Sequence, residues 1–292
     1  MAPLLIADVP WLLYRAFFAL PKSIVDGEGQ PVNALLGTVN ALLAAVESVR
    51  PRAVVACLGA EQADYRVALY PPYHAHRDPM PPVLARQFEL APRMLESLGW
   101  TVSIIESLEA DDLMLSFAQS EEAAGGDALL MTADRDLFAA VTDRVAVLEQ
   151  RKGGAPAKVG PAQVRERYGV DPACVPDFIA LRGDPSDGIP GAAGIGAKTA
   201  AELLGAYGSL EALLDAAAQP SAVISGDLRP RVAAVLRESD GQLRAFKEVA
   251  TLQKLKVRRP KDRPTDTKRG AAAARALGMK RLGERLEAMT TA

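Results

Sequence analysis

Acidic side chains follow three of the first four β-rich runs of the sequence, at the point where each run ends. Asp8 closes the first run, an acidic group beginning at Glu109 follows the third, and Asp134 follows the fourth. Ligands of open parallel sheets collect beyond the carboxyl ends of the strands. These carboxylates would therefore share one edge of a sheet, where anions repel each other unless cations lie between them.

The predicted cluster has eight acids, because the later loop RGDPSDGIPG adds two more. Its members are Asp8, Glu109, Asp111, Asp112, Asp134, Asp136, Asp184 and Asp187. Taken singly, Asp8 or Asp134 could cap a helix and Asp184 could hold a turn. Their repetition at one edge favours a metal site instead. Oxygen ligands without histidine suit Mg²⁺ or Mn²⁺, and this many can hold two ions about 4 Å apart for phosphodiester hydrolysis.

The spacing within each acidic group predicts the direction of its side chains. If EADDLMLSFA opens a helix, Glu109 and Asp112 share one face, while Asp111 points about a quarter turn away. One face could then hold a metal while the other carboxylate orients water. Asp134 and Asp136 alternate as neighbours at a strand end do, so both could reach the same side.

The elements that must position these acids are short apolar runs alternating with longer helical patterns. The predicted strands are Pro3 to Ala7, Ala53 to Leu58, Thr101 to Ile105, Asp127 to Thr132 and Arg144 to Leu148. The predicted helices are Trp11 to Leu20, Asn33 to Ser48, Leu84 to Leu98, Ala110 to Glu122 and the shorter Leu137 to Val141. Runs that are apolar on both faces suit strands covered by helices on both sides. The alternation predicts an α/β fold with a mostly parallel sheet.

The Gly- and Pro-containing loop from Arg151 to Ala157 is the predicted end of the sheet domain. No β-rich run of similar quality follows it, so we expect the rest to be mainly helical. The charged, Pro-punctuated stretch from Lys256 to Gly270 predicts a wrapping or flexible segment. The Ala-rich end of the chain returns to a helical pattern.

Composition predicts an ordered globular protein. The chain has 292 residues, of which 49% are hydrophobic, and no stretch approaches the roughly 18 apolar residues of a membrane helix. Its N-terminus carries Asp8 where a signal peptide would be apolar, so we expect a cytoplasmic protein. Cys57 and Cys174 are the only cysteines, which excludes a disulfide framework or a CxxC metal site.

A glycine-rich turn precedes the helix that is predicted to begin near Lys198. Gly191, Gly194 and Gly196 lie in PGAAGIGAKTA, and exposed amides at a helix start can bind phosphate. Small residues also let a nucleic-acid backbone come close. An ordinary corner between two helices is the alternative reading of this turn.

Together these motifs resemble the five-prime nuclease family, which includes the N-terminal domain of bacterial DNA polymerase I and the flap endonucleases. The resemblance runs over nearly the whole chain. Asp8, Tyr14 and Arg15 match the family's opening, and EADD and TADRD match its metal-binding motifs. The stretch from Gly183 to Ala200 matches its GDxSDNxPGxxGIGxKTA pattern.

The resemblance implies a PIN-like (resolvase-like) three-layer domain over residues 1–160 and a helical domain with a helix-hairpin-helix (H3TH) motif over 161–292. It implies a two-metal 5'-3' exonuclease and flap endonuclease acting in DNA replication and repair. K⁺ would bind at the hairpin turn, and a DNA polymerase or sliding clamp is a possible partner. No polymerase region is found, so we expect a stand-alone nuclease. The implied DNA contacts are Tyr14, Arg15, Gly191, Gly194, Gly196, Lys198 and Thr199.

The resemblance also implies a helical arch over the site, around residues 66–93. Arg66, His74 and Arg77 would face the scissile phosphate or the threaded strand and join Asp8 in catalysis. The alternative is that His74 and His76 are surface residues of the Pro-rich sequence YPPYHAHRDPMPP.

Three positions depart from the family pattern. Gly59 stands where an Asp usually follows the second strand, His74 where a Lys is typical, and Gly188 where Asn is usual. We expect the missing acid to weaken metal affinity or alter cleavage preference. Two other functions stay open: a DNA-binding protein with decayed catalysis, which would bind flaps without turnover, and an RNA-cutting enzyme on the same scaffold.

The net charge of −2 conceals a polarity along the chain. Up to Asp227 there are 17 Lys and Arg against 29 Asp and Glu, whereas from Leu228 there are 17 against 7. We expect the basic part to hold duplex DNA through phosphate contacts, with an affinity that falls steeply with salt.

Overall fold

A six-stranded sheet forms the centre of the first domain in the computed structural model, which describes residues 2–150, 156–219 and 228–290. Its order is β3-β2-β1-β4-β5-β6, and all neighbours are parallel except β5 and β6. The strands are β1 (Leu4–Asp8), β2 (Ala53–Leu58), β3 (Thr101–Ile104), β4 (Ala128–Met131), β5 (Val145–Glu149) and β6 (Ala157–Val159). The strand order reverses at β1, so the crevice between β1 and β4 is the expected ligand site.

The five predicted strands are confirmed, each end to within one residue. The sequence missed β6, which has only three residues and lies at the sheet edge. The predicted boundary loop ends at Ala157, where β6 begins, and its residues 151–155 lie outside the described part of the chain.

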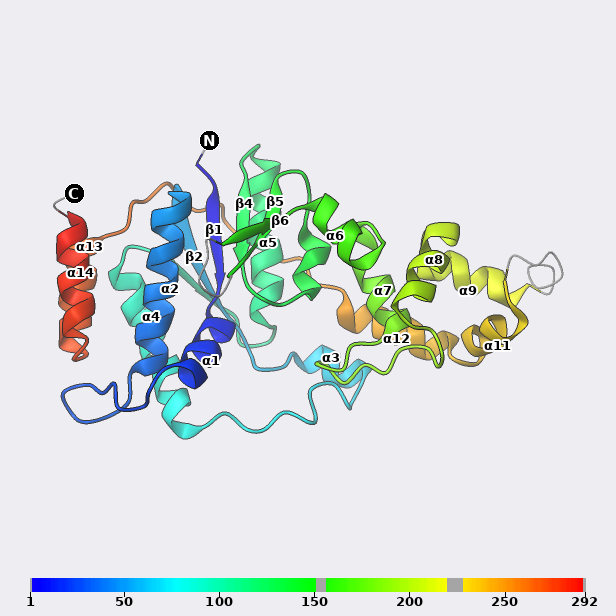
Figure 1. Ribbon diagram of the computed structural model, residues 1–292, viewed down its shortest axis with the longest axis horizontal. Coiled ribbons are helices and arrows are strands. Elements are labelled where there is room, and N and C mark those ends of the chain that lie inside the picture. Colours follow the sequence, from blue (N-terminus) through cyan, green and yellow to red (C-terminus); the bar gives the residue numbers. More distant parts are fainter. Residues whose placement is uncertain (1, 151–155, 220–227, 291–292) are drawn as a thin grey trace.

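Helices cover both faces of the sheet (Figure 1). One face packs against α1 (Val9–Ala19), α2 (Asn33–Val49) and α4 (Pro82–Ser97), and the other against α5 (Ala110–Ala123) and the 3-10 helix η1 (Asp136–Ala140). Leu4 and Ile6 point to the second face, and Leu5 and Ala7 to the first, because strand side chains alternate. The predicted helices are confirmed to within two residues, except that the last is a 3-10 turn. The layers match the predicted three-layer α/β domain.

The second domain is helical. Its elements are α6 (Pro161–Tyr168), η2 (Pro172–Cys174), α7 (Val175–Arg182), α8 (Ala197–Tyr207), α9 (Leu210–Ala218), α11 (Pro230–Glu238) and α12 (Asp240–Ala250). No helix among the described residues has the length and apolar character to cross a bilayer.

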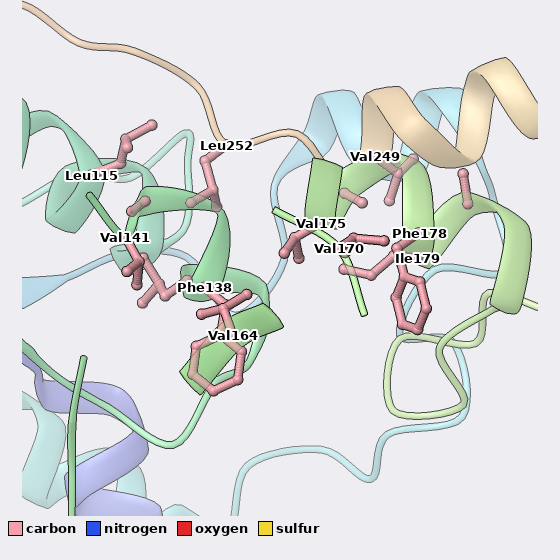
Figure 2. Close-up of a cluster of buried hydrophobic side chains, with 14 of the residues drawn as sticks. Leu115, Phe138, Val141, Val164, Val170, Val175, Phe178, Ile179, Val249 and Leu252 are labelled. Atoms are coloured by element: carbon pink, nitrogen blue, oxygen red, sulfur yellow. The ribbon is translucent and has the colours of Figure 1, made fainter. Parts of the chain in front are cut away.

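One apolar core joins the two domains. Figure 2 shows this band of buried side chains, which runs from Leu115 of α5 through Phe138 of η1 to Phe178 of α7 and Val249 of α12. Because the same cluster includes strand residues, the helical domain is seated on the sheet domain through shared apolar burial.

The chain then returns to the first domain, which differs from the predicted division at residue 160. Residues 251–266 form no helix or strand, and α13 (Thr267–Ala276) and α14 (Lys280–Thr290) lie beside α2 and α4 (Figure 1). Ala271 and Leu286 belong to the apolar cluster on that face of the sheet. Residues 161–292 are therefore not one spatial unit. Apolar residues of α13 and α14 pack against the apolar face of α4 in the first domain.

A strap, defined as residues 251–266, is fastened by a buried acid. Glu121 on α5 has a side chain 1% exposed and accepts hydrogen bonds from Arg52 and Arg259. Arg52 also donates to the carbonyl of Pro260 at 2.9 Å. The strap overlaps the wrapping segment predicted for Lys256 to Gly270, whose last four residues belong instead to α13. Its Arg259 helps to hold the fold together.

The predicted helical arch at 66–93 is not one helical unit. A short helix, α3 (Asp64–Leu69), is followed by a crossing segment, defined as residues 70–81, that contains no helix. Pro71, Pro72, Pro79 and Pro81 disfavour a helix there. From residue 82 the chain enters α4, whose apolar face packs into the core.

We predict that Glu121→Ala lowers the free energy of unfolding by about 3–5 kcal/mol, because Arg52 would be left buried without this partner. Denaturant unfolding monitored by circular dichroism measures the change. Glu287→Ala is the matched control, since the Arg275–Glu287 pair is about half exposed, and it should leave the unfolding midpoint nearly unchanged. Equal effects of the two substitutions would contradict a role for the buried acid.

Candidate active site

A cavity of about 1240 Å³ opens beyond the carboxyl ends of β1 and β4. It lies between the sheet, the crossing segment and a loop of the helical domain. Seven of the eight predicted acids line it, namely Asp8, Glu109, Asp111, Asp134, Asp136, Asp184 and Asp187. The topology therefore brings together carboxylates from both domains, as the strand-end pattern indicated.

Asp8 both caps a helix and faces the cavity. Its Oδ1 accepts from the backbone N–H of Trp11 at 3.0 Å, and its Oδ2 accepts from Thr132 Oγ1 at 2.7 Å. Thr132 Oγ1 in turn accepts from the N–H of Asp134 at 2.9 Å. One hydroxyl thus ties the ends of β1 and β4 together and fixes the carboxylate between them.

Three acids of the cavity are buried close to other acids. Desolvation and the charges of nearby acids, including Asp187 and Asp8, raise the pKa of Asp134 to about 6. The same two causes hold the pKa values of Asp111 and Asp136 well above the ordinary range. Raised values of this kind mark anions that are crowded together and shielded from water.

Glu109 and Asp112 do share a helix face, as predicted, but that face is turned toward Arg66. Arg66 is 2% exposed; its guanidinium lies 2.8 Å from Glu109 Oε1 and 3.2 Å from Asp112 Oδ1. Glu109 also accepts from Tyr73 Oη at about 3 Å and from the N–H of Ala63 at 2.9 Å.

Asp112 does not line the cavity, so the prediction that it is a metal ligand is not supported by its position. Its side chain is fully buried, and Oδ1 accepts from the N–H of Gln253 at 2.6 Å as well as from Arg66. Oδ2 accepts from the N–H of Glu109 at 3.3 Å, which completes the capping box of α5. The carboxylate that points into the cavity from this helix is Asp111.

A tight loop supplies the last two acids. Asp184 and Ile189 exchange two backbone hydrogen bonds of 2.8 Å, and Asp184 Oδ1 accepts from the N–H of Ser186 at 2.9 Å. Asp187 Oδ1 lies 2.9 Å from His74 Nε2 and 3.2 Å from an Arg77 nitrogen. Burial opposes the shift, but the His74 hydrogen bond and the Arg77 charge lower the pKa of Asp187.

The three predicted basic residues therefore meet acids. Arg66 and His74 are both buried, the first between Glu109 and Asp112 and the second against Asp187. Arg77 is about half exposed, so it is the one of the three whose charge remains open to the cavity.

Of the predicted DNA contacts on α1, Tyr14 lines the cavity and Arg15 does not. Tyr14 Oη donates to Glu61 Oε1 at 2.6 Å, whereas the Arg15 guanidinium lies 5.5 Å from the centre of the Trp11 ring. The sequence reading missed Glu61 and Phe18, which also line the cavity. The sequence could have indicated both: Glu61 is an acid three residues after the second strand, and Phe18 follows Tyr14 by one helical turn.

The glycine hairpin is formed as predicted and is open to solvent. Gly191 and Gly194 have φ values of 69° and 77°, and Gly196 caps α8. A Cβ at Gly194 or Gly196 would meet no atom within 4 Å. Lys198 is 90% exposed and Thr199 follows it on the first turn of α8. The amides at this helix start can therefore meet a phosphate.

Part of the basic C-terminal region is engaged within the protein. Eight of its 17 Lys and Arg bind acids or carbonyl oxygens, namely Arg237, Arg244, Lys247, Arg259, Arg263, Arg269, Arg275 and Arg285. About half of the positive charge after Leu228 therefore stabilises the fold, and the salt dependence of DNA binding stays a prediction.

Gly59 marks no vacancy in the acid cluster. A Cβ at this position would lie 2.5 Å from the backbone N of Ala110 and 2.6 Å from the carbonyl O of Leu108. The N–H of Ala60 donates to that carbonyl at 2.8 Å. The backbone leading into Glu109 therefore occupies the space that a side chain at 59 would need.

The donor set fits divalent cations. It consists of carboxylate oxygens only, and the raised pKa values of Asp111, Asp134 and Asp136 reflect anions that a cation would neutralise. Among the described residues, no three His, Cys, Asp or Glu side chains are close enough together to hold one metal ion. The acids share a cavity in the structure without forming a closed coordination sphere.

Comparison with known proteins adds sequence and fold relationships. Residues 3–169 match the family model described as the N-terminal resolvase-like domain of 5'-3' exonuclease, and residues 170–264 match its C-terminal SAM fold. A 5'-3' exonuclease of Mycobacterium tuberculosis (strain H37Rv) is 32% identical over 314 residues, covering 98% of this chain and 97% of that protein. DNA polymerase I of the same strain is 36% identical over 239 residues; the match covers 81% of this chain but 26% of the polymerase.

The D15 flap endonuclease of bacteriophage T5, solved with DNA and metal ions, aligns with a TM-score of 0.68. The alignment covers 99% of this chain and all of that chain, at 17% identity. This likeness concerns the fold, and it extends over both domains.

We predict that Gly59→Asp lowers stability instead of restoring a ninth ligand, because any Cβ at this position meets backbone. Gly59→Ala should cost about as much, roughly 1–3 kcal/mol. Thermal unfolding measures both. Gly205→Ala is the control, since nothing lies within 4 Å of a Cβ in that exposed turn of α8, and it should be neutral or stabilising. Tight metal binding by a stable Gly59→Asp variant would refute this packing argument.

We predict that Asp134→Asn stabilises the metal-free protein at pH 7.5. A folded pKa near 6, above the unfolded value, means that the charged form of Asp134 destabilises the fold. The gain in melting temperature should shrink as pH falls through about 6 and disappear below about pH 3, where the wild-type carboxyl is neutral in both states. Calorimetry in a chelator over this range measures it; a gain that grows toward low pH would have the wrong sign.

Proposed function

The chain belongs to the 5'-3' exonuclease family, and on that premise we propose that it hydrolyses DNA phosphodiester bonds at 5' ends and flaps. The observation that carries the proposal is the gathering of seven carboxylates from both domains in one cavity. The chain spans about a quarter of the length of its DNA polymerase I relatives, so replication and repair roles are inferred for the nuclease region alone.

We infer that Mg²⁺ or Mn²⁺ ions bind between these carboxylates. The proposed ligands are Asp8, Glu109, Asp111, Asp134, Asp136, Asp184 and Asp187. Bound ions of this kind activate water and stabilise the leaving oxygen of a phosphodiester. The protein's contribution is the orientation of its acids, since Thr132 fixes Asp8 and the closed loop at Asp184 fixes Asp187.

Substrate DNA would be held at two places. The exposed amides of the glycine hairpin and Lys198 offer a phosphate site for the duplex, with K⁺ proposed at the same turn. At the cavity, Arg77 presents a half-exposed guanidinium and Tyr14 an aromatic ring fixed by Glu61. A DNA polymerase or sliding clamp as partner and a cytoplasmic location remain predictions.

Two alternative functions are also distinguished by the nuclease assay. A DNA-binding protein without turnover was suggested by Gly59 and His74. The close packing of backbone at Gly59 weakens the first of these two grounds. An RNA-directed nuclease would use the same acids. Parallel DNA, RNA and hybrid substrates separate the latter from a DNA enzyme.

We predict that the purified protein shortens a 5'-labelled flapped or nicked duplex when Mg²⁺ or Mn²⁺ is present and not after chelation. Asp134→Ala should reduce the rate by at least about 100-fold, because it removes a proposed metal ligand from the lining of the cavity. Product lengths on a denaturing gel report activity, polarity and metal preference together.

Asp127→Ala is the matched control. Asp127 precedes the same strand β4 at its opposite end and is about half exposed, so its loss should leave the rate unchanged. Flap binding without cleavage under either metal would rule out the proposed activity.

A further inference from the structure

The crossing segment is fastened to the acidic loop of the helical domain. His74 contributes two of the contacts, through Nε2 to Asp187 Oδ1 at 2.9 Å and through its N–H to the Asp187 carbonyl at 3.3 Å. Tyr70 Oη donates to the carbonyl of Gly188 at 3.0 Å, and Arg77 donates to Asp187 Oδ1 at 3.2 Å. Figure 1 shows this segment running along the lower edge of the molecule from α3 to α4.

We propose that His74 is a positioning residue for Asp187 and not a group that contacts the scissile phosphate. Its side chain is 3% exposed, and the carboxylate can only accept, so Nε2 carries the hydrogen that Asp187 receives. Nδ1 is buried and has no partner among the described residues. Neither ring nitrogen is therefore presented to a substrate.

The orientation of the His74 ring is set by stacking on a neighbouring ring and by the backbone conformation of its own turn. It stacks on Tyr73 with ring centres 3.8 Å apart, and the Tyr73 hydroxyl is itself bound to Glu109. The backbone of His74 has a φ of 55°, a left-handed conformation that an L-residue keeps only where its surroundings demand it. Arg77 closes the turn by donating its N–H to the His74 carbonyl at 2.9 Å.

In this arrangement the two oxygens of the Asp187 carboxylate have different roles. Oδ1 accepts from both His74 and Arg77, so Oδ2 is the oxygen that this proposal assigns to a cation in the cavity, where Asp136 also lies within hydrogen-bonding reach of the carboxylate. Hydrogen bonds to a ligating carboxylate fix its direction, and removing them typically lowers metal affinity about 10- to 100-fold. The inference rests on the proposed function only in taking Asp187 as a metal ligand.

The test uses the full-length protein without DNA and compares the chain's only two histidines. His74→Ala should weaken Mn²⁺ binding at least about tenfold in calorimetric titration and speed amide hydrogen exchange of residues 184–188. His74→Gln, which keeps a nitrogen donor at similar reach, should stay near wild type. His76→Ala is the control for metal affinity, because the exposed His76 ring lies beside Gly188 and forms no hydrogen bond with Asp187, so Mn²⁺ binding should not change.

Kinetics separate positioning from contact with the phosphate. If His74 acts through Asp187, saturating Mn²⁺ should restore the kcat of His74→Ala to within about threefold of wild type, because only the affinity for the ion has been lost. Wild-type Mn²⁺ affinity and loop exchange in a folded His74→Ala variant would overturn the proposal. So would equal losses in His74→Ala and His74→Gln. Because binding and exchange are measured without substrate, these results do not depend on whether the nuclease activity is found.

Discussion

The repulsion between carboxylates gathered in one cavity is the constraint on which the site depends. The chain meets part of it with its own cations, since Arg66 lies between Glu109 and Asp112. Repulsion remains at Asp111, Asp134 and Asp136, whose pKa values are raised by desolvation and by the charges of neighbouring acids. A fold that concentrates unbalanced anions at a strand edge gives up stability in the metal-free state and in return offers a strong site for cations.

The surrounding structure holds this unfavourable arrangement in place. Thr132 joins the ends of β1 and β4, and the apolar core that continues from the sheet into α7 and α12 carries the loop of Asp184 toward them. The strap returns over the sheet and is fastened at Glu121, which does not line the cavity. The hydrogen bonds of Thr132 at the strand ends and the apolar core that carries the Asp184 loop together keep the acids close, although they repel each other.

The sequence was sufficient for what depends on local pattern. Strands apolar on both faces, the cap at Asp8 and the helix face shared by Glu109 and Asp112 are all set by neighbours in the chain. It was insufficient where the partner is remote. Asp112 is withdrawn from the cavity by Arg66, 46 residues away, and Arg259 is used by Glu121, 138 residues away. A charge count cannot reveal such pairs, so it did not show that about half of the cations after Leu228 are bound within the protein.

Gly59 shows how a difference from a family pattern acquires a physical meaning. Considered as sequence, it is an acid that has been lost. In the structure the backbone of residues 108–110 lies against its Cα, and the hydrogen bond from the Ala60 N–H to the Leu108 carbonyl holds it there. The same close approach places Glu109 where Arg66 and Tyr73 can bind it. The glycine is therefore part of how Glu109 is positioned, and the site has been built around a smaller set of acids.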